Sequence, residues 1–348
     1  MKKRNNPFTL TFGKQPNTQI SRFENISNIM DMFSAENPVS QTCLIEGIRG
    51  SGKTVLMTTV CHQLAEEDDW IIVHLNPAME LLRELAWRLS EACKKVPRLL
   101  RKGFRLSIAG TGFGISGEEV SQDYVGIIED ILKQVKTKNK RVLITIDEVQ
   151  HSQEMRIFAS QFQIFIREDY PLYLIMTGLY ENLHEIQNDP ALTFLLRAPK
   201  VKMEPLSLLQ IRNQYRKVFE ADDRTVAELA GLTKGYAFAF QALGSVFWNS
   251  GKKKVDEEML ETFDAMLDDY VYKKIWEGLT SKDREIILAM REPETSVRDI
   301  CNRIAMSSST FAHYRDKLIR QGILQATSHG MVALTLPRFV EIAESYLL

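Results

Sequence analysis

The feature that most constrains the fold is a glycine-rich motif in the first part of the chain. Residues 47–54 read Gly-Ile-Arg-Gly-Ser-Gly-Lys-Thr and directly follow a largely apolar run at residues 43–46. This is the pattern G-x-x-x-x-G-K-[ST], which places a phosphate-cradling loop between a strand and a helix. Glycines let backbone N–H groups turn toward phosphate oxygens, and the helix start favours an anion. The motif therefore predicts an α/β fold with a nucleotide-binding P-loop.

The side chains of this loop have distinct expected roles. Lys53 reaches the β- and γ-phosphates of ATP, and the Thr54 hydroxyl holds Mg²⁺. ATP and Mg²⁺ are therefore the ligands that the sequence predicts. The other residues expected to contact the nucleotide are Gly47, Ile48, Arg49, Gly50, Ser51, Gly52 and Val55.

An acidic pair supplies the second signal. Asp147 and Glu148 follow an apolar, β-branched run at residues 141–146 that reads as a strand. A carboxylate in this place can hold Mg²⁺, and the next one can deprotonate the water that attacks the γ-phosphate. We therefore expect Asp147 to bind the metal and Glu148 to act as general base, with Gln150 and His151 orienting Glu148.

Two further residues extend the expected catalytic site. Thr177 ends a strand expected at residues 172–176, where its hydroxyl can hydrogen-bond the attacking water or the γ-phosphate. Arg197 precedes a short strand at residues 201–203, and a guanidinium there can stabilise transition-state charge in a neighbouring subunit. The alternative interpretations are a strand-capping threonine and a surface arginine.

Composition narrows the class of protein. The chain has 348 residues, with 44 Lys and Arg against 45 Asp and Glu, so 44 − 45 gives a net charge of −1. No strong overall field steers such a chain to nucleic acid or acidic lipid, which does not exclude a local basic face. The 4 cysteines are scattered without C-x-x-C spacing, which predicts reduced thiols rather than a metal site. No signal-peptide pattern or membrane-spanning run is visible, so we expect a cytoplasmic protein.

The order of strand and helix patterns divides the chain. Strands and helices alternate up to about residue 203, which predicts a parallel sheet covered on both faces. We expect an arm and P-loop ATPase domain at 1–204, a helical lid at 205–279 and a further domain at 280–348. Within the first domain, a basic run at 94–105 reads as a solvated helix end or a phosphate-backbone contact. The glycine-rich segment 106–117 that follows reads as a hairpin or a loop.

These motifs resemble those of the AAA+ and STAND-related P-loop ATPases, in the prokaryotic branch near the archaeal origin-recognition initiators. The N-terminal arm resembles that group too, with Asn-Pro-Phe-Thr at 6–9, Thr-Phe-Gly at 11–13 and Ser-Arg-Phe at 21–23. The resemblance covers nearly the whole chain. It implies a sheet of order 5-1-4-3-2, Arg22 near the adenine, Thr177 as sensor 1 and a lid from Pro205 onward.

Some positions depart from the family pattern. Initiator-type members carry a lid arginine as sensor 2, whereas residues 233–244 contain no arginine. That stretch looks more like the Gly-x-Pro motif of STAND proteins, with Ala237 where the proline would stand. Ser21 takes the place of the glycine in the usual Gly-Arg box. The absence of a sensor 2 arginine favours slow, switch-like turnover.

The C-terminal segment has the pattern of a winged helix, which is a helix-turn-helix variant. Helices are expected at 281–291 and 295–305, a serine-rich turn at 306–310 leads into a third helix, and two short strands surround residues 328–330. In this fold the third helix enters the major groove of DNA. The expected DNA contacts are Ser308, Ser309, Thr310, His313, Arg315, Lys317 and Arg320.

Two functions therefore remain open. The first is a Mg-ATP-dependent ATPase that contacts duplex DNA through the winged helix and can form a homo-oligomer. The second is a STAND-like ATP-dependent signalling switch whose C-terminal domain docks a protein partner. Residues 281–348 hold nine Lys and Arg against eight Asp and Glu, so 9 − 8 gives +1, which is little for a DNA-binding domain. The sequence does not separate roles in replication, transposition or signalling.

Overall fold

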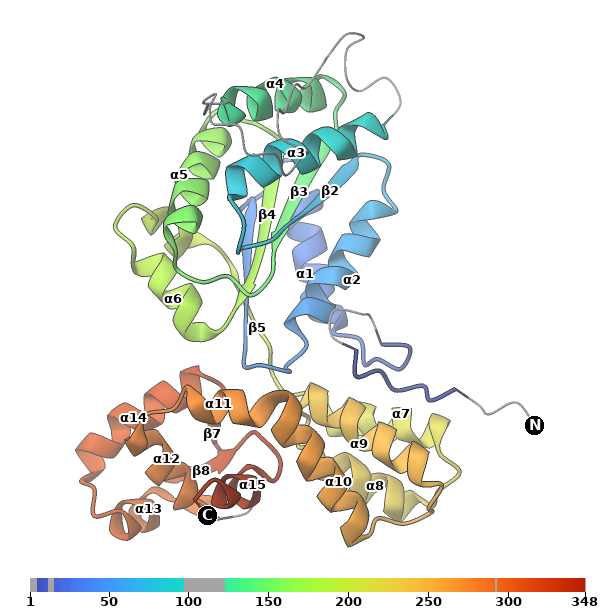
Figure 1. Cartoon of the computed structure of the whole chain (residues 1–348), viewed down its shortest axis with the longest axis vertical. Coiled ribbons are helices and arrows are strands. Elements are labelled where there is room, and N and C mark those ends of the chain that lie inside the picture. Colours follow the sequence, from blue (N-terminus) through green and yellow to red (C-terminus); the bar gives the residue numbers. More distant parts are fainter. Residues whose placement is uncertain (1–4, 12–15, 97–122, 292, 348) are drawn as a thin grey trace, which may run out of the picture. The chain divides into compact units, whose positions relative to one another are not determined.

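The structure is a computed structural model that describes residues 5–11, 16–96, 123–291 and 293–347 (Figure 1). The glycine-rich segment and most of the basic run lie outside the described residues. The chain forms two compact units, each assembled from separate stretches of sequence. We call residues 22–46 with 56–202 the sheet unit, and residues 1–21, 47–55 and 203–348 the C-terminal unit. The three-domain division expected from the sequence stays a prediction.

The sheet unit is built on five parallel strands. They are β1 (Thr42–Glu46), β2 (Trp70–Leu75), β3 (Arg141–Ile146), β4 (Leu172–Gly178) and β5 (Lys200–Lys202). Their order is β2-β3-β4-β1-β5, which read from the other edge is the expected 5-1-4-3-2. The central strands β1, β3 and β4 are buried almost throughout, as expected for parallel strands covered on both faces. The predicted α/β P-loop fold is confirmed.

Helices precede and connect these strands, and two of them begin at a side-chain cap. The helices are α1 (Phe23–Ser34), α2 (Lys53–Ala65), α3 (Leu81–Lys94), α4 (Tyr124–Thr137), α5 (Gln153–Arg167), α6 (Tyr180–Asn188) and the 3-10 helix η1 (Thr193–Arg197). Asp123 accepts a hydrogen bond from the Gly126 N–H, and Ser152 accepts one from the Met155 N–H. Each cap satisfies an amide that the first helical turn leaves without a backbone partner.

Alternate residues of the strands face opposite sides of the sheet. Ile144 and Leu174 lie in one hydrophobic core together with the apolar faces of α3, α4 and α5. Figure 1 shows α3 lying across the strands, with α4 next to it. On the other face, Phe33 of α1 packs against Trp70 and Tyr173, with ring centroids 6.4 and 5.1 Å away. Both faces of the sheet are thus covered.

The helical part of the C-terminal unit follows the sheet in the sequence. It consists of α7 (Leu208–Val218), α8 (Asp223–Leu232), α9 (Ala237–Ser250), α10 (Glu257–Leu267), η2 (Asp268–Tyr272) and α11 (Lys273–Glu277). Asp222 and Asp256 cap α8 and α10 by accepting hydrogen bonds from the backbone N–H groups of Thr225 and Met259. The short element η2 is a single π-helical turn, a conformation that often occurs at functional sites.

The last part of the chain forms the winged helix that the sequence predicts. Its elements are α12 (Ser281–Leu288), β6 (Thr295–Ser296), α13 (Val297–Arg303), α14 (Ser308–Arg320), β7 (Leu324–Ala326), β8 (Met331–Leu334) and α15 (Phe339–Ser345). The first strand of its antiparallel sheet, which has the order β6-β8-β7, lies between α12 and α13, and the other two strands follow α14.

The boundaries differ in three places. Residues 295–296 form a strand rather than the start of a helix, because they pair with Val332 and Met331. Residues 308–310 belong to the first turn of α14 rather than to a turn before it, because Ser307 is the N-cap. The terminal helix α15 was not expected from the sequence.

One hydrophobic core runs through the C-terminal unit and includes the N-terminal arm. Phe8 of the arm is buried beside Tyr215 and Phe240, with ring centroids 5.8 Å away from it in both cases. The same core continues through Tyr272 to Phe339 in α15. The lid helices and the winged helix therefore share apolar packing instead of having separate cores.

Candidate functional site

The P-loop follows β1 without a break, since Gly47 comes directly after Glu46. Gly50 and Gly52 have φ angles of 71° and 94°, in the left-handed region that side chains disfavour. A Cβ on Gly47 would come within 2.7 Å of the Met203 Cβ. Gly50 and Gly52 are therefore required by the backbone of the loop, as a phosphate cradle demands, and Gly47 is required by the close approach of Met203.

The Lys53 side chain turns back over this loop. Its exposed fraction is 6%, and its ammonium donates hydrogen bonds to the carbonyls of Gly47 at 2.9 Å and Ile48 at 3.0 Å. Lys53 and Thr54 are the first two residues of α2, so the charge stands at a helix N-terminus. These features fit the phosphates of a nucleotide.

Residues at the start of α9, far away in the sequence, also hold the P-loop by hydrogen bonds. The Tyr236 hydroxyl donates to the Arg49 carbonyl at 2.6 Å, and the Phe238 N–H donates to the Gly50 carbonyl at 3.0 Å. The sequence pointed to residues 233–244 only as a departure from the family pattern. It gave no signal that Tyr236 bonds to the P-loop, because the hydrogen bond joins residues far apart in the chain.

The acidic pair lies at the end of β3, and a threonine hydroxyl joins its two members. The Thr177 hydroxyl donates to the Asp147 carboxylate and accepts from the Glu148 N–H at 3.1 Å. The Thr177 carbonyl accepts from the Val149 N–H at 2.9 Å. The structure thus brings together Asp147, Glu148 and Thr177, which the sequence predicted as one site.

The backbone of Glu148 is unusual. Its φ angle is 52°, in a region that residues other than glycine seldom occupy. Such conformations persist only where surrounding contacts impose them, and they concentrate at functional sites. Here the hydrogen bonds from Glu148 and Val149 to Thr177 impose it, and the Glu148 side chain is exposed. A carboxylate in this position can reach a water molecule.

His151 has a different partner from the one that the sequence suggested. Its Nε2 lies 3.0 Å from the Asp189 carboxylate, which also lies 3.4 Å from the Arg156 Nε. The hydrogen bond with His151, together with one from the Ala191 N–H, lowers the pKa of Asp189. His151 therefore links the segment before α5 to the end of α6, and its expected role in orienting Glu148 stays a prediction.

Arg22 and Arg197 lie at helix ends. Arg22 is the partly buried N-cap residue of α1, and Arg197 is the exposed last residue of η1. Exposure suits a residue that acts on a neighbouring subunit. The roles of both residues toward a nucleotide stay predictions.

The residues predicted to contact DNA are all on α14. Ser308, Ser309 and Thr310 are exposed in its first turn, and the Thr310 N–H donates to the N-cap hydroxyl of Ser307 at 3.2 Å. His313 and Arg320 are also exposed. Arg315 lies 2.9 Å from the Asp316 carboxylate, which partly neutralises its charge.

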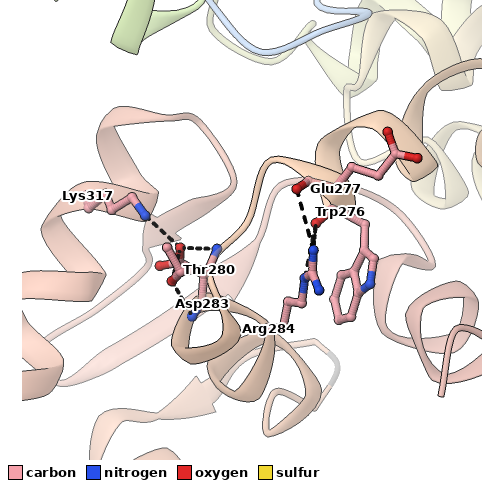
Figure 2. Close-up of polar contacts among 6 residues, drawn as sticks. All are labelled: Trp276, Glu277, Thr280, Asp283, Arg284 and Lys317. Carbon is pink, nitrogen blue, oxygen red and sulfur yellow. Dashed lines mark hydrogen bonds and ion pairs between the residues drawn. The ribbon is translucent and has the colours of Figure 1, made fainter.

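Lys317 is engaged inside the winged helix (Figure 2). Its ammonium donates to the Asp283 carboxylate at 2.6 Å, and Asp283 is fully buried. The same carboxylate accepts from the Thr280 N–H at 2.9 Å in the capping box of α12. Breaking such a buried pair leaves an uncompensated charge, so Lys317 is a link between α14 and α12 as well as a basic residue of α14. Sequence reasoning missed Asp283, whose partner is remote in the chain.

A second cationic side chain in this region, that of Arg284, is held by a backbone carbonyl and an aromatic ring. The Arg284 guanidinium donates to the Trp276 carbonyl, with its Nε at 3.1 Å, and lies over the Trp276 ring at 5.2 Å (Figure 2). Arg284 therefore fastens α12 to α11.

Membrane-spanning helices and metal clusters are both absent from the part of the chain that the structure describes. Among those residues, no helix is long and apolar enough to cross a membrane. They also contain no cluster of three or more His, Cys, Asp or Glu side chains able to hold a metal ion by themselves. A Mg²⁺ ion at Asp147 would therefore depend on nucleotide oxygens or water for its other ligands.

Comparisons with known proteins agree with the fold and the motifs. Residues 40–187 match the AAA domain family, and residues 269–341 match a domain of unknown function (DUF8462). The structure of Aeropyrum pernix ORC2 in ADPNP and ADP complexes has a TM-score of 0.59 and 12% identity, covering 96% of each chain. Cdc6p from Pyrobaculum aerophilum has a TM-score of 0.52 and 12% identity, covering 97% of this chain and 98% of that one. Curated proteins give no match to the sequence.

At such identities the two structures show a common fold. Residues 40–187 are similar to the AAA domain family, and the chain shares the fold of the ORC2 and Cdc6p structures.

Proposed function

We propose that the protein binds Mg-ATP at the P-loop, hydrolyses it with the acidic pair, and contacts duplex DNA through its winged helix. The observation that carries the ATPase part is the position of Thr177, whose hydroxyl bonds to both members of the acidic pair. Gly178, the next residue, pairs in register with Glu46, the residue before the P-loop. The strand that carries Thr177, the partner of the acidic pair, is therefore the sheet neighbour of the strand that leads into the P-loop.

Each residue has a defined task in this proposal. Lys53 binds the β- and γ-phosphates, and Thr54 and Asp147 hold Mg²⁺. When bound, Mg²⁺ neutralises charge that develops on the phosphate oxygens. Glu148 takes a proton from the attacking water, and Thr177 keeps Glu148 and Asp147 in place through its two hydrogen bonds.

Three proteins test the ATPase proposal: the wild type, Lys53→Ala and Glu148→Gln. We expect the wild type to hydrolyse ATP only with Mg²⁺. Lys53→Ala should bind a fluorescent ATP analogue at least tenfold more weakly, whereas Glu148→Gln should bind it normally and lose hydrolysis by about 10²-fold or more. Full turnover by Glu148→Gln would remove Glu148 from the mechanism.

Arg197 is proposed to act on a neighbouring subunit. Its exposure at the end of η1 supports this, because an arginine that acts in trans must be accessible. We expect the rate per subunit to rise with protein concentration and this rise to be lost in Arg197→Ala. A rate that does not depend on concentration would mean a self-contained site.

The DNA proposal rests on α14, whose first turn, His313 and Arg320 are exposed in a winged-helix arrangement. Fluorescence anisotropy of a labelled duplex over a range of salt concentrations tests it. We expect Arg320→Ala to reduce the slope of log K against log salt by about 1. Lys282→Ala on α12, which removes an exposed lysine paired with Glu285 at 2.6 Å, is the matched control and should leave the slope unchanged.

The second candidate is an ATP-dependent switch whose winged helix docks a protein. The engagement of Lys317 by Asp283 and of Arg315 by Asp316 favours it, since both pairs reduce the positive charge that α14 offers to phosphates. Absence of salt-sensitive DNA binding at low ionic strength would support this candidate. The ATPase measurements would then show slow turnover that duplex DNA does not change.

A further inference from the structure

We propose that Tyr236 is a positioning residue of the P-loop, which holds the loop backbone in its binding conformation through one hydrogen bond. The proposal rests on the proposed nucleotide function and adds a residue outside the sequence motifs. Tyr236 donates to the Arg49 carbonyl at 2.6 Å, and the neighbouring Phe238 N–H donates to the Gly50 carbonyl at 3.0 Å. Two consecutive carbonyls of the loop are therefore fixed from α9.

Tyr236 and the loop fit each other closely. A Cβ on Gly50 would lie 2.2 Å from the Tyr236 hydroxyl oxygen, so the hydroxyl needs a glycine at this position. Only 5% of Tyr236 is exposed, and water does not easily replace the hydrogen bond. Burial also raises the pKa of the Tyr236 phenol above its usual range, so the group stays protonated and remains a donor.

The turn before Tyr236 is itself fixed. Lys234 and Gly235 have φ angles of 48° and 78°, and a Cβ on Gly235 would lie 2.5 Å from the Leu206 carbonyl oxygen. The Leu206 N–H donates to the Gly235 carbonyl at 2.7 Å. Tyr236 is thus presented by a rigid segment, which is what a positioning residue requires.

The packing behind Tyr236 connects it to the winged helix. Its ring stacks on Tyr272 of η2 with centroids 6.3 Å apart, and the Tyr272 hydroxyl donates to the Pro337 carbonyl at 2.7 Å. Ile48 of the P-loop packs against the same hydrophobic core. The P-loop is therefore supported by contacts that continue into the winged helix.

A loop held in one conformation loses less entropy when it binds a ligand, so the hydrogen bond from Tyr236 should raise nucleotide affinity. The test is Tyr236→Phe, which keeps the ring and removes only the donor. Tyr215→Phe is the matched control, because the fully buried Tyr215 also donates to a backbone carbonyl, that of Phe240 at 2.7 Å, away from the loop. Both variants should lose a similar amount of thermal stability.

Two measurements on the full chain separate positioning from stability. Without nucleotide, amide hydrogen exchange of a peptide covering residues 47–52 should be about fivefold faster in Tyr236→Phe and unchanged in Tyr215→Phe. The dissociation constant of a fluorescent ATP analogue should rise about fivefold in Tyr236→Phe and change less than twofold in Tyr215→Phe.

The outcomes are distinct. Unchanged exchange and affinity in Tyr236→Phe, or equal changes in the two variants, would overturn the positioning role. If the wild type binds no ATP analogue, the proposed nucleotide function fails, and the exchange comparison still decides whether Tyr236 holds the loop.

Discussion

A single hydroxyl organises the acidic end of the candidate site. Thr177 is completely buried at the end of β4, and its side chain bonds to Asp147 and to the backbone of Glu148. Glu148 adopts a positive φ angle, so its side chain direction depends on these bonds rather than on strand geometry. The position of the proposed general base is thus set by a residue in another strand.

We therefore expect Thr177→Val to slow ATP hydrolysis by about 10- to 100-fold while changing nucleotide affinity little, because a displaced general base costs rate more than binding. Single-turnover hydrolysis and analogue binding measure the two effects. Thr145→Val is the control, since Thr145 is an equally buried strand threonine whose hydroxyl bonds to His74 instead, at 2.6 Å. Equal losses of rate in both variants would indicate general destabilisation of the sheet.

Three buried cysteines provide a prediction about thiol reactivity. Burial raises the pKa of Cys43, Cys61 and Cys93 to about 12. The thiolate is the reactive form, so at pH 8 only about 10⁻⁴ of each thiol is reactive, and raising the pH toward 12 increases that fraction. We expect alkylation of these residues, followed by mass spectrometry, to be negligible in the folded protein and rapid in urea. Modification of the folded protein at the rate of an unstructured peptide would contradict the burial.

The residues of the site differ in how far the sequence reveals them. Asp147 and Thr177 follow apolar runs at the ends of strands, and parallel strands bring such ends to one edge of a sheet. Tyr236 and Asp283 act through partners that are distant in the chain, at Arg49 and Lys317. No local pattern marks such pairs, so only the folded structure identifies them.

At the scale of elements, the N-terminal arm depends on one helix. Asn6 donates to the Ser245 hydroxyl at 3.0 Å, and the Thr9 N–H donates to the Gln241 side chain at 3.0 Å, both on α9. Phe8 between them lies against Gly244, where a Cβ would come within 2.4 Å of its ring. The absence of a side chain at Gly244 therefore makes room for the arm.

We expect Gly244→Ala to displace the arm and to lower the free energy of unfolding by about 1–3 kcal/mol, as overpacking does. Faster hydrogen exchange in residues 5–11 would report the displacement. Gly231→Ala on α8 is the control, because a Cβ there meets nothing within 4 Å and should be neutral or stabilise by about 0.4–1 kcal/mol. An arm that keeps its protection in Gly244→Ala would show that its docking does not need the space.

The predicted helices and strands agree with the observed ones where the hydrophobic periodicity is strong. The five parallel strands and the helices of the winged helix were expected near their observed positions. The strand at 295–296 has only two residues, and its partner in β8 lies more than thirty positions away, so a helix pattern was the better local match. The π-turn η2 contains the buried Tyr272, and no periodicity of the sequence marks such a turn.

On the scale of the whole molecule, the cores do not follow the linear order of the sequence. One core belongs to the sheet and its helices, and the other contains residues from Phe8 to Ala343. A sequence can only be divided at points along the chain, which is why it suggested a boundary near residue 280. Apolar contacts cross that point, since Tyr272 and Trp276 on one side pack against Phe339 on the other.

This continuity predicts the behaviour of a shortened chain. A protein that ends at residue 279 loses Phe339 and Pro337, the partners of the fully buried Tyr272, and exposes the apolar surface that they cover. We expect it to bind the dye ANS and to lack the calorimetric unfolding transition of the C-terminal unit. The transition of the sheet unit should persist, because its core contains none of the removed residues. Adding residues 280–348 as a separate chain should reduce ANS binding. If the protein of residues 1–279 instead unfolds cooperatively and binds no ANS, the lid and the winged helix fold independently.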